Sequence, residues 1–200
     1  IAAHPDDEIL GCGGSMAKWT NEGHDVHVLI MAEGATSRDK SRNRAARQNE
    51  LLDLSQSARH AGQILNVNSI ELLDFPDNRM DSIDLLDVVK VIEEKIAKVK
   101  PDILVTHHVG DLNIDHQIIH QAVMVACRPQ PRHNVKRILS FEVPSATEWQ
   151  SPADGRAFLP NWFEDISDTL ELKIMALEAY KSEMRKWPHA RSIKTLEHLA

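Results

Sequence analysis

Short runs of strand-forming apolar residues alternate along this chain with longer stretches whose apolar residues recur every three or four positions. The first pattern indicates buried strands, and the second indicates helices with one apolar face. Strands are predicted at residues 25–31, 69–73, 103–106 and 137–143, and residues 1–3 read as the end of an earlier strand. Because helices separate the strands, the alternation predicts an α/β domain built on a parallel sheet.

Helical periodicity places four helices between and after these strands. Their apolar faces fall at residues 51–65, 86–99, 119–126 and 167–184. A chain of 200 residues suits one domain with a substantial core. We therefore expect residues 1–200 to form a single Rossmann-like, three-layer α/β/α domain with a mostly parallel sheet of about five strands.

The segment after the last predicted strand has a different composition. Residues 144–160 hold three prolines, one glycine and several polar residues, which predicts a long surface excursion within a loop-rich C-terminal extension. Trp149, Trp162 and Phe163 could form a contact between subunits of a homo-oligomer or a lid over a substrate, and the sequence leaves both open. The first residues read as strand and the last as helix, so we expect both ends to be trimmed.

The charge balance bears on the class of partner. Lys and Arg total 23 against 30 Asp and Glu, and the formal charge of −7 argues against nucleic acid or an anionic membrane as the main partner. No apolar run is long enough to span a bilayer and no secretion signal is visible, so we expect a cytoplasmic protein that acts on a small molecule. The two cysteines, Cys12 and Cys127, are predicted to be reduced thiols.

A dense cluster of ionisable residues directly follows the first predicted strand. It reads His4-Pro5-Asp6-Asp7-Glu8. In open α/β sheets, ligands bind outside the carboxyl ends of the strands, which makes this a candidate site. The alternative is a helix start at which Asp6 or Asp7 acts as the cap, because acids are favoured there by the helix dipole.

A second cluster follows the strand predicted at residues 103–106. It reads His107-His108-Val109-Gly110-Asp111-Leu112-Asn113-Ile114-Asp115-His116, with His120 one turn later. If the two strands are parallel and close in the sheet, both clusters meet at one place. They would then offer the His and carboxylate ligands that zinc accepts.

Two motifs carry a resemblance to a known family. The segment Ala3-His4-Pro5-Asp6-Asp7-Glu8, followed by Gly11-Cys12-Gly13-Gly14, resembles the signature of the PIG-L/LmbE family of zinc-dependent de-N-acetylases, and Asp111-Leu112-Asn113-Ile114-Asp115-His116 resembles its second motif. The motifs stand in the family's order, and the similarity in pattern spans the whole chain. The resemblance implies a hydrolase that removes an N-acetyl group from an N-acetylglucosamine-type amino-sugar conjugate.

The resemblance also implies roles for individual residues. It implies that His4, Asp7 and His116 bind one Zn²⁺ and leave a coordination position for water or the substrate carbonyl. Asp6 would then be the general base that takes a proton from the attacking water. Asp115 is expected to orient a histidine or to hold charge behind the metal.

One residue departs from the family's pattern. Many members carry a His where this chain has Asn113, and that His is thought to support the oxyanion. Asn113 can still donate a hydrogen bond to the oxyanion, but it cannot titrate. Any role as general acid would pass to Asp6, His107 or His108, and the sequence does not choose among them.

Further residues are candidates for substrate binding. Residues 37–47 carry a basic run that reads either as a solvated face or as a grip for an acidic or phosphorylated part of the substrate, with Arg38 and Arg79 the residues to test. His108 either lines the pocket or is a plain loop residue. We interpret His120 as a helix-surface or core residue and not as a metal ligand.

Two other functional classes stay open at this point. A metal-dependent phosphoesterase would also use His and Asp, but its two-metal site needs more bridging carboxylates than these motifs supply. A non-catalytic sugar- or metal-binding domain would give Asp6 no purpose beyond capping. The sequence does not identify the particular amino-sugar conjugate.

Overall fold

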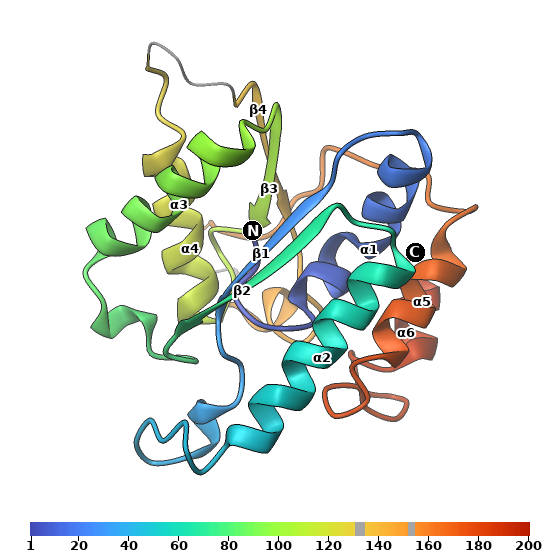
Figure 1. Cartoon of the computed structure of the whole chain (residues 1–200). Coiled ribbons are helices and arrows are strands. Elements are labelled where there is room, and N and C mark those ends of the chain that lie inside the picture. Colours follow the sequence, from blue (N-terminus) through green and yellow to red (C-terminus); the bar gives the residue numbers. More distant parts are fainter. Residues whose placement is uncertain (131–134, 152–154) are drawn as a thin grey trace.

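The computed structural model describes residues 1–130, 135–151 and 155–200 (Figure 1). Its strands are β1 (His27–Ala32), β2 (Ser69–Phe75), β3 (Ile103–His107) and β4 (Arg137–Phe141). Strand pairing among these residues is parallel: β1 pairs with β2 in one sheet, and β3 pairs with β4 in another. The strands lie where the sequence predicts them, within a few residues at each end.

The first three residues lie between the two sheets. Ala2 forms a single parallel bridge with Ile30 of β1, and the amino group of Ile1 donates a 2.7 Å hydrogen bond to the carbonyl of Val105 in β3. The structure thus has two two-stranded sheets joined through residues 1–3, where the sequence predicts one sheet of about five strands. The difference arises because one bridge is not a ladder, so this short segment does not form a strand of its own.

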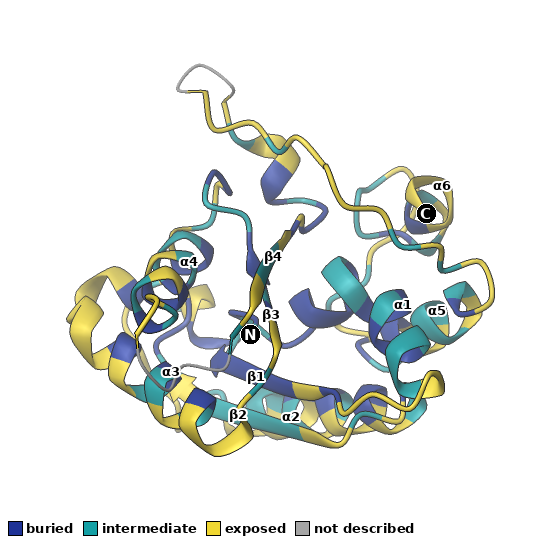
Figure 2. Cartoon of the chain, turned by 90° about the horizontal axis from the view of Figure 1, so that it is seen from above, coloured by how far each residue is buried: buried dark blue, intermediate teal, exposed yellow. Residues whose placement is uncertain are grey.

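Helices cover both faces of this central layer, as the figures show. They are α1 (Asp7–Asn21), α2 (Gln48–Ile64), α3 (Leu85–Val99), α4 (Ile114–Ala126), α5 (Leu170–Glu178) and α6 (Ile193–Leu199). Val28 and Ile30 of β1 pack into a core shared with α1, α2, α5 and α6, whereas Leu29 and Met31 pack against α3 and α4. Successive strand residues point to opposite faces, so β1 is buried from both sides (Figure 2).

The first helix packs very closely on the sheet. A Cβ atom added at Gly11 would collide with the ring of Phe141 in β4, so only glycine fits at this position. This close approach fixes α1 against β4. It thereby places the residues that begin α1 beside the ends of the strands.

The described residues between β4 and α5 are mostly irregular. One short 3₁₀ turn, η3 (Thr147–Trp149), lies among them, and the helix predicted at residues 167–184 is formed only over Leu170–Glu178. Residues 152–154 of the predicted excursion 144–160 lie outside the described residues. No helix in the described part of the chain is both long enough and apolar enough to cross a bilayer.

Candidate metal and catalytic site

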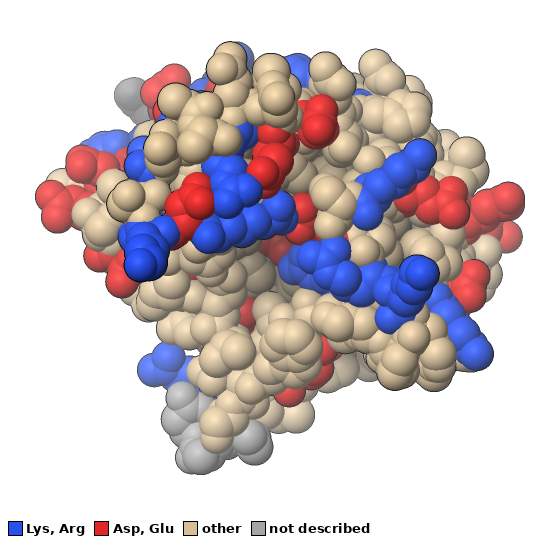
Figure 3. All heavy atoms as spheres, turned by 90° about the horizontal axis from the view of Figure 1, so that it is seen from below, with Lys and Arg blue, Asp and Glu red and all other residues tan. Residues whose placement is uncertain are grey.

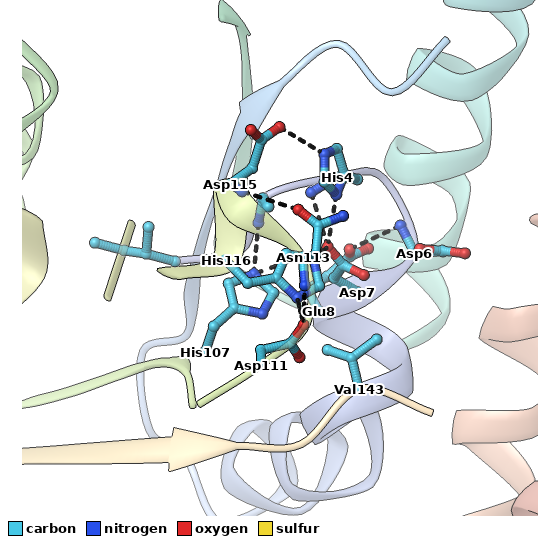
Figure 4. A network of polar contacts seen from close by, with 12 residues as sticks. His4, Asp6, Asp7, Glu8, His107, Asp111, Asn113, Asp115, His116 and Val143 are labelled. Atoms are coloured by element: carbon cyan, nitrogen blue, oxygen red, sulfur yellow. Dashed lines mark hydrogen bonds and ion pairs between the residues drawn. The ribbon is translucent and has the colours of Figure 1, made fainter. Parts of the chain in front are cut away.

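The two ionisable clusters of the sequence meet at the carboxyl ends of the strands (Figure 4). His4 lies in the turn just before α1, Asp7 is the first residue of α1, and His116 lies in the first turn of α4. Asp7 Oδ2 is 3.2 Å from His4 Nδ1 and 3.1 Å from His116 Nε2. One ligand atom from each of the three residues falls within 4.8 Å of the others, so these side chains could hold one metal ion.

Three buried polar atoms of this group lack a hydrogen bond. Asp7 Oδ1 and both ring nitrogens of His116 have no partner with hydrogen-bond geometry, although both side chains are almost fully buried. Leaving such atoms unpaired costs about 1–3 kcal/mol each. Two imidazoles and one carboxylate are a donor set that zinc accepts, with a position left open. The residues present therefore fit a divalent metal ion of this kind.

Further carboxylates lie behind the two histidines. Asp115 Oδ2 is 3.0 Å from His4 Nε2, and Asp111 Oδ1 is 3.1 Å from His116 Nδ1. Carboxylates in this position fix the tautomer and orientation of a ligating histidine. The sequence did not predict this role for Asp111, although Asp111 is the first residue of the second motif.

These outer carboxylates are themselves held in place. Asp115 accepts hydrogen bonds from the backbone N–H groups of Asn78, at 2.6 Å, and Met80, at 2.9 Å. Asp111 Oδ2 accepts one from the hydroxyl of Thr147 at 2.6 Å. The support for the two histidines thus comes from the β2–α3 connection and from η3, both distant in sequence from the motifs.

The site raises the pKa of His4 and lowers the pKa of Asp7. Burial opposes the charged form of His4, but hydrogen bonds to Asp115 and Asp7 raise its pKa well above the ordinary value. Burial likewise opposes ionisation of Asp7, yet His116 and His4 hold its pKa well below the usual range. The cluster therefore favours a carboxylate on Asp7.

Asp6 occupies the N-cap position of α1 but does not act as a side-chain cap. Its backbone lies in the left-handed region, with φ of 114°, and its side chain makes no capping hydrogen bond. The Asp6 carboxylate instead accepts a 2.7 Å hydrogen bond from Nη1 of Arg191. Burial raises the pKa of Asp6 well above its ordinary value, and the charge of Arg191 opposes this rise. The capping alternative thus does not explain this side chain.

Glu8 forms a buried pair with a residue far along the chain. Its Oε1 accepts a 2.6 Å hydrogen bond from the hydroxyl of Tyr180, and its Oε2 accepts one from the backbone N–H of Asp6 at 3.1 Å. Burial raises the pKa of Glu8 to about 7. Sequence reasoning missed Tyr180 and Arg191, because nothing in their local pattern indicates contact with residues 6–8.

Asn113 caps the helix that carries His116. Its Oδ1 accepts a 2.9 Å hydrogen bond from the backbone N–H of Asp115, and its Nδ2 donates one to Asn78 Oδ1 at 2.8 Å. An amide nitrogen has two hydrogens, so one donor remains after this contact. Asn113 borders the candidate metal site (Figure 4).

The three remaining histidines of the second cluster have different surroundings. His107 is fully buried, stacks on His116 with ring centroids 3.8 Å apart, and accepts the backbone N–H of Ala3 at Nε2. Burial and the neighbouring His116 hold the pKa of His107 well below its usual value. His108 contacts the carbonyl of Arg156, and His120 contacts that of His107. His108 and His120 therefore do not join the ligand group.

The predicted substrate-binding arginines lie outside the ligand group. Arg38 forms salt bridges with Glu50 at 3.1 Å and Glu183 at 2.9 Å. Arg79 donates to the carbonyl of Asp39 and, with Asn78, lines a cavity. On the face of the molecule seen in Figure 3, Lys and Arg side chains lie among acidic ones. The basic run is thus a mixed surface in which Arg42, Arg44 and Arg47 also pair with carboxylates.

Comparison with known proteins connects this geometry to a family. The sequence profile described as "PIG-L: GlcNAc-PI de-N-acetylase" matches residues 1–127. The chain is 32% identical over 188 residues to the uncharacterized deacetylase YaiS of Escherichia coli (strain K12), covering 91% of this chain and 89% of that protein. It is 29% identical over 199 residues to a diacetylchitobiose deacetylase of Thermococcus kodakarensis, covering 92% of this chain and 68% of that protein.

Similarity to solved structures with the same fold covers most of the chain. The conserved protein TT1542 from Thermus thermophilus has a TM-score of 0.74 at 19% identity, covering 98% of this chain and 82% of that one. The 4-carboxy-2-hydroxymuconate hydratase GalB of Pseudomonas putida KT2440 has a TM-score of 0.70 at 17% identity, covering 100% of this chain and 82% of that one. Since this fold also carries a hydratase, the reaction must be argued from the site.

Proposed function

The chain belongs to the PIG-L family of deacetylases, and from this membership we propose that it is a zinc-dependent hydrolase that removes an N-acetyl group from an N-acetylglucosamine-type conjugate. One observation carries the proposal. The buried atoms of Asp7 and His116 that lack hydrogen bonds lie beside His4, and the Asp6 carboxylate is bound by Arg191, whose guanidinium is also 3.9 Å from Asp7 Oδ1. A hydrolase needs both a place for a metal ion and a nearby base.

His4, Asp7 and His116 are the proposed zinc ligands, one ion per chain. When bound there, zinc would polarise the acetyl carbonyl and lower the pKa of a water molecule. Asp115 and Asp111 would hold the two imidazoles with the ligating nitrogens turned toward the ion. This division of roles is supported by the distances within the group.

Asp6 is the proposed general base. Its Oδ2 accepts the hydrogen bond from Arg191, so Oδ1 is the atom we expect to take the proton of the attacking water. The same carboxyl would then return this proton to the leaving amine. His107 is a poor alternative as the acid, because its Nε2 accepts the backbone N–H of Ala3 and the one proton of the neutral ring is then on Nδ1, which is buried without a hydrogen-bond partner.

Asn113 and Arg79 are proposed to contact the substrate. The second N–H hydrogen of Asn113 would donate to the oxygen that becomes negatively charged as water attacks. Arg79 lines the cavity beside Asn78, where it could contact an acidic part of the conjugate. Arg38 and His108 are already engaged by Glu50, Glu183 and the carbonyl of Arg156, so we expect them to matter less.

Metal analysis combined with a product screen tests the proposal. Purified protein is expected to contain one zinc per chain and to release acetate from at least one N-acetylglucosamine conjugate. Release of phosphate from phosphoesters would identify a phosphoesterase instead. Zinc binding with no release of either product would identify a binding protein.

The Asp6→Asn variant tests the base. It removes the proton acceptor and keeps the size of the side chain, so we expect kcat to fall about 10²- to 10⁴-fold. The zinc content measured on the same sample should stay that of the parent. Full activity in this variant would rule out Asp6 as the base.

A further inference from the structure

We infer that Arg191, which lies outside the family match at residues 1–127, is a positioning residue that sets the orientation of the Asp6 carboxylate for proton transfer. The inference rests on the proposed function, because it assigns the partner of the proposed base. It makes the C-terminal part of the chain a component of the site.

The contact itself is short and mostly buried. Nη1 of Arg191 is 2.7 Å from Asp6 Oδ2, and the two side chains are 21% and 2% exposed. Nη2 of the same guanidinium lies 3.9 Å from Asp7 Oδ1. Charge-assisted hydrogen bonds of this kind are strong and directional, and the planar guanidinium fixes the carboxylate in one orientation.

The backbone around Arg191 is held in place by its own contacts. Its carbonyl accepts the backbone N–H of Arg185 at 3.1 Å, and the next residue, Ser192, is the side-chain cap of α6. Leu196 of α6 is 2% exposed and belongs to the core that α1 and α2 share. The guanidinium thus projects from a segment that is fixed against the body of the domain.

The side chain has a second anchor. Nε of Arg191 donates a 2.7 Å hydrogen bond to the hydroxyl of Ser145, just ahead of η3. Thr147 of η3 in turn donates to Asp111, the carboxylate behind His116. The arginine and the outer carboxylate are therefore held by the same short segment, which relates the position of the base to that of the proposed ligands.

Asp6 needs such a partner because its own helix does not fix it. It lies in a left-handed conformation that non-glycine residues seldom adopt, and its carboxylate makes no capping hydrogen bond. It is also the first of three consecutive buried acids, Asp6, Asp7 and Glu8. With Oδ2 bound to Arg191, Oδ1 is the oxygen left to act on water.

Kinetics of Arg191→Met, alone and combined with Asp6→Asn, test this assignment. Misplacing a catalytic group can cost about 100-fold in rate, so Arg191→Met should lower kcat by about that factor and leave KM within about twofold. Zinc content should be unchanged. In the Asp6→Asn background the same substitution should cause no further loss, because Arg191 acts through Asp6.

Two other variants complete the design. Arg191→Lys keeps the charge without the planar guanidinium, and we expect it to lower kcat less than Arg191→Met does. This variant also tests the inference if Arg191→Met does not fold. Arg185→Met is the matched control from the same segment, since the Arg185 side chain contacts only the carbonyls of Ser182 and Met184 in the hydrogen bonds described. Its kinetics should equal those of the parent.

Specific outcomes would overturn the inference. A raised KM with unchanged kcat would make Arg191 a substrate contact, and an equal loss in both backgrounds would make its role independent of Asp6. Crystal structures give a readout without activity: the Asp6 carboxylate should move in Arg191→Met, and an unmoved carboxylate would contradict the inference. Absence of acetate release by the parent would instead reject the proposed function.

Discussion

Two buried groups of charged side chains follow the ends of strands in this molecule, and they differ in how completely their hydrogen bonds are made. The first group surrounds Glu33, the residue directly after β1. The side chain of Glu33 is 3% exposed. Its Oε1 accepts from Thr36 at 2.7 Å and Arg42 at 2.8 Å, and its Oε2 accepts from Arg42 at 3.1 Å and Arg44 at 2.8 Å. Every oxygen of this carboxylate is satisfied by the protein.

The second group surrounds Asp7 and has the opposite character. Asp7 and His116 are as deeply buried as Glu33, yet Asp7 Oδ1 has no hydrogen bond, and the two nitrogens of His116 lie 3.1 Å from carboxylate oxygens of Asp7 and Asp111 without hydrogen-bond geometry. Buried polar atoms are rarely left in this state. The Glu33 group is therefore complete as a structural element, whereas the Asp7 group keeps polar atoms that the proposed metal ion would engage.

Removal of a proposed ligand should produce the largest difference between the two groups. In His116→Ala the proposed metal site loses one of its three protein donors, and we expect kcat/KM to fall about 1,000-fold or more, since metal polarisation is worth several kcal/mol. Zinc content, measured by atomic absorption, should fall in parallel. His120→Ala, one turn further along α4, is the matched control and should keep its zinc. Zinc retained at full occupancy in His116→Ala would remove the distinction between the groups.

The sequence predicted where the Asp7 group lies better than it predicted the residues that contact this group. The alternation of strands and helices indicated the α/β class, and the two ionisable motifs after strands indicated where to search, because parallel strands place their carboxyl ends together. The structure brings His4, Asp7 and His116 within reach of one another. The resemblance to the PIG-L family is confirmed by the family match.

Other parts of the site depend on tertiary packing that no local pattern encodes. Arg191 and Tyr180 reach residues 6–8 from the C-terminal part of the chain, and the backbone N–H of Asn78 supports Asp115 from the β2–α3 connection. The basic run at residues 37–47 was visible in the sequence, but its pairing with Glu33 could not be predicted from it. The single sheet of about five strands is not confirmed, because in the described residues the first segment forms one bridge, at Ala2, between two two-stranded sheets.

Loss of an outer carboxylate should have a smaller effect than loss of a ligand. Asp115→Asn keeps the shape behind His4 but removes the charge that orients its imidazole, so zinc affinity should fall about 10- to 100-fold. Competition with a chelator of known affinity measures this change. Asp81→Asn, an acid on the neighbouring turn Met80–Ser82, serves as the control. Equal affinities for Asp115→Asn and the parent would mean that Asp115 acts only through its contacts with the backbone of Asn78 and Met80.

The smallest effect is expected at Glu33, where no ligand is involved. Burial opposes ionisation of Glu33, but hydrogen bonds from Arg42 and Thr36 lower its pKa below the ordinary value. A lowered pKa in the folded state stabilises the protein above the unfolded pKa of about 4.3, and this contribution disappears as the pH falls through the folded value. Because Arg42 and Arg44 are 36% and 46% exposed, we expect Glu33→Gln to cost only about 1 kcal/mol at neutral pH.

Urea unfolding of the metal-free proteins measures this difference without interference from the first group. The gap between parent and Glu33→Gln should be present at neutral pH and should close in acid, whereas acetate release at neutral pH with zinc should not change. Glu71→Gln is the control, because Glu71 pairs with Lys95 at 2.7 Å while 45% exposed and should contribute little at any pH. A loss of zinc affinity in Glu33→Gln would break the comparison, because it would show that the satisfied group supports the unsatisfied one.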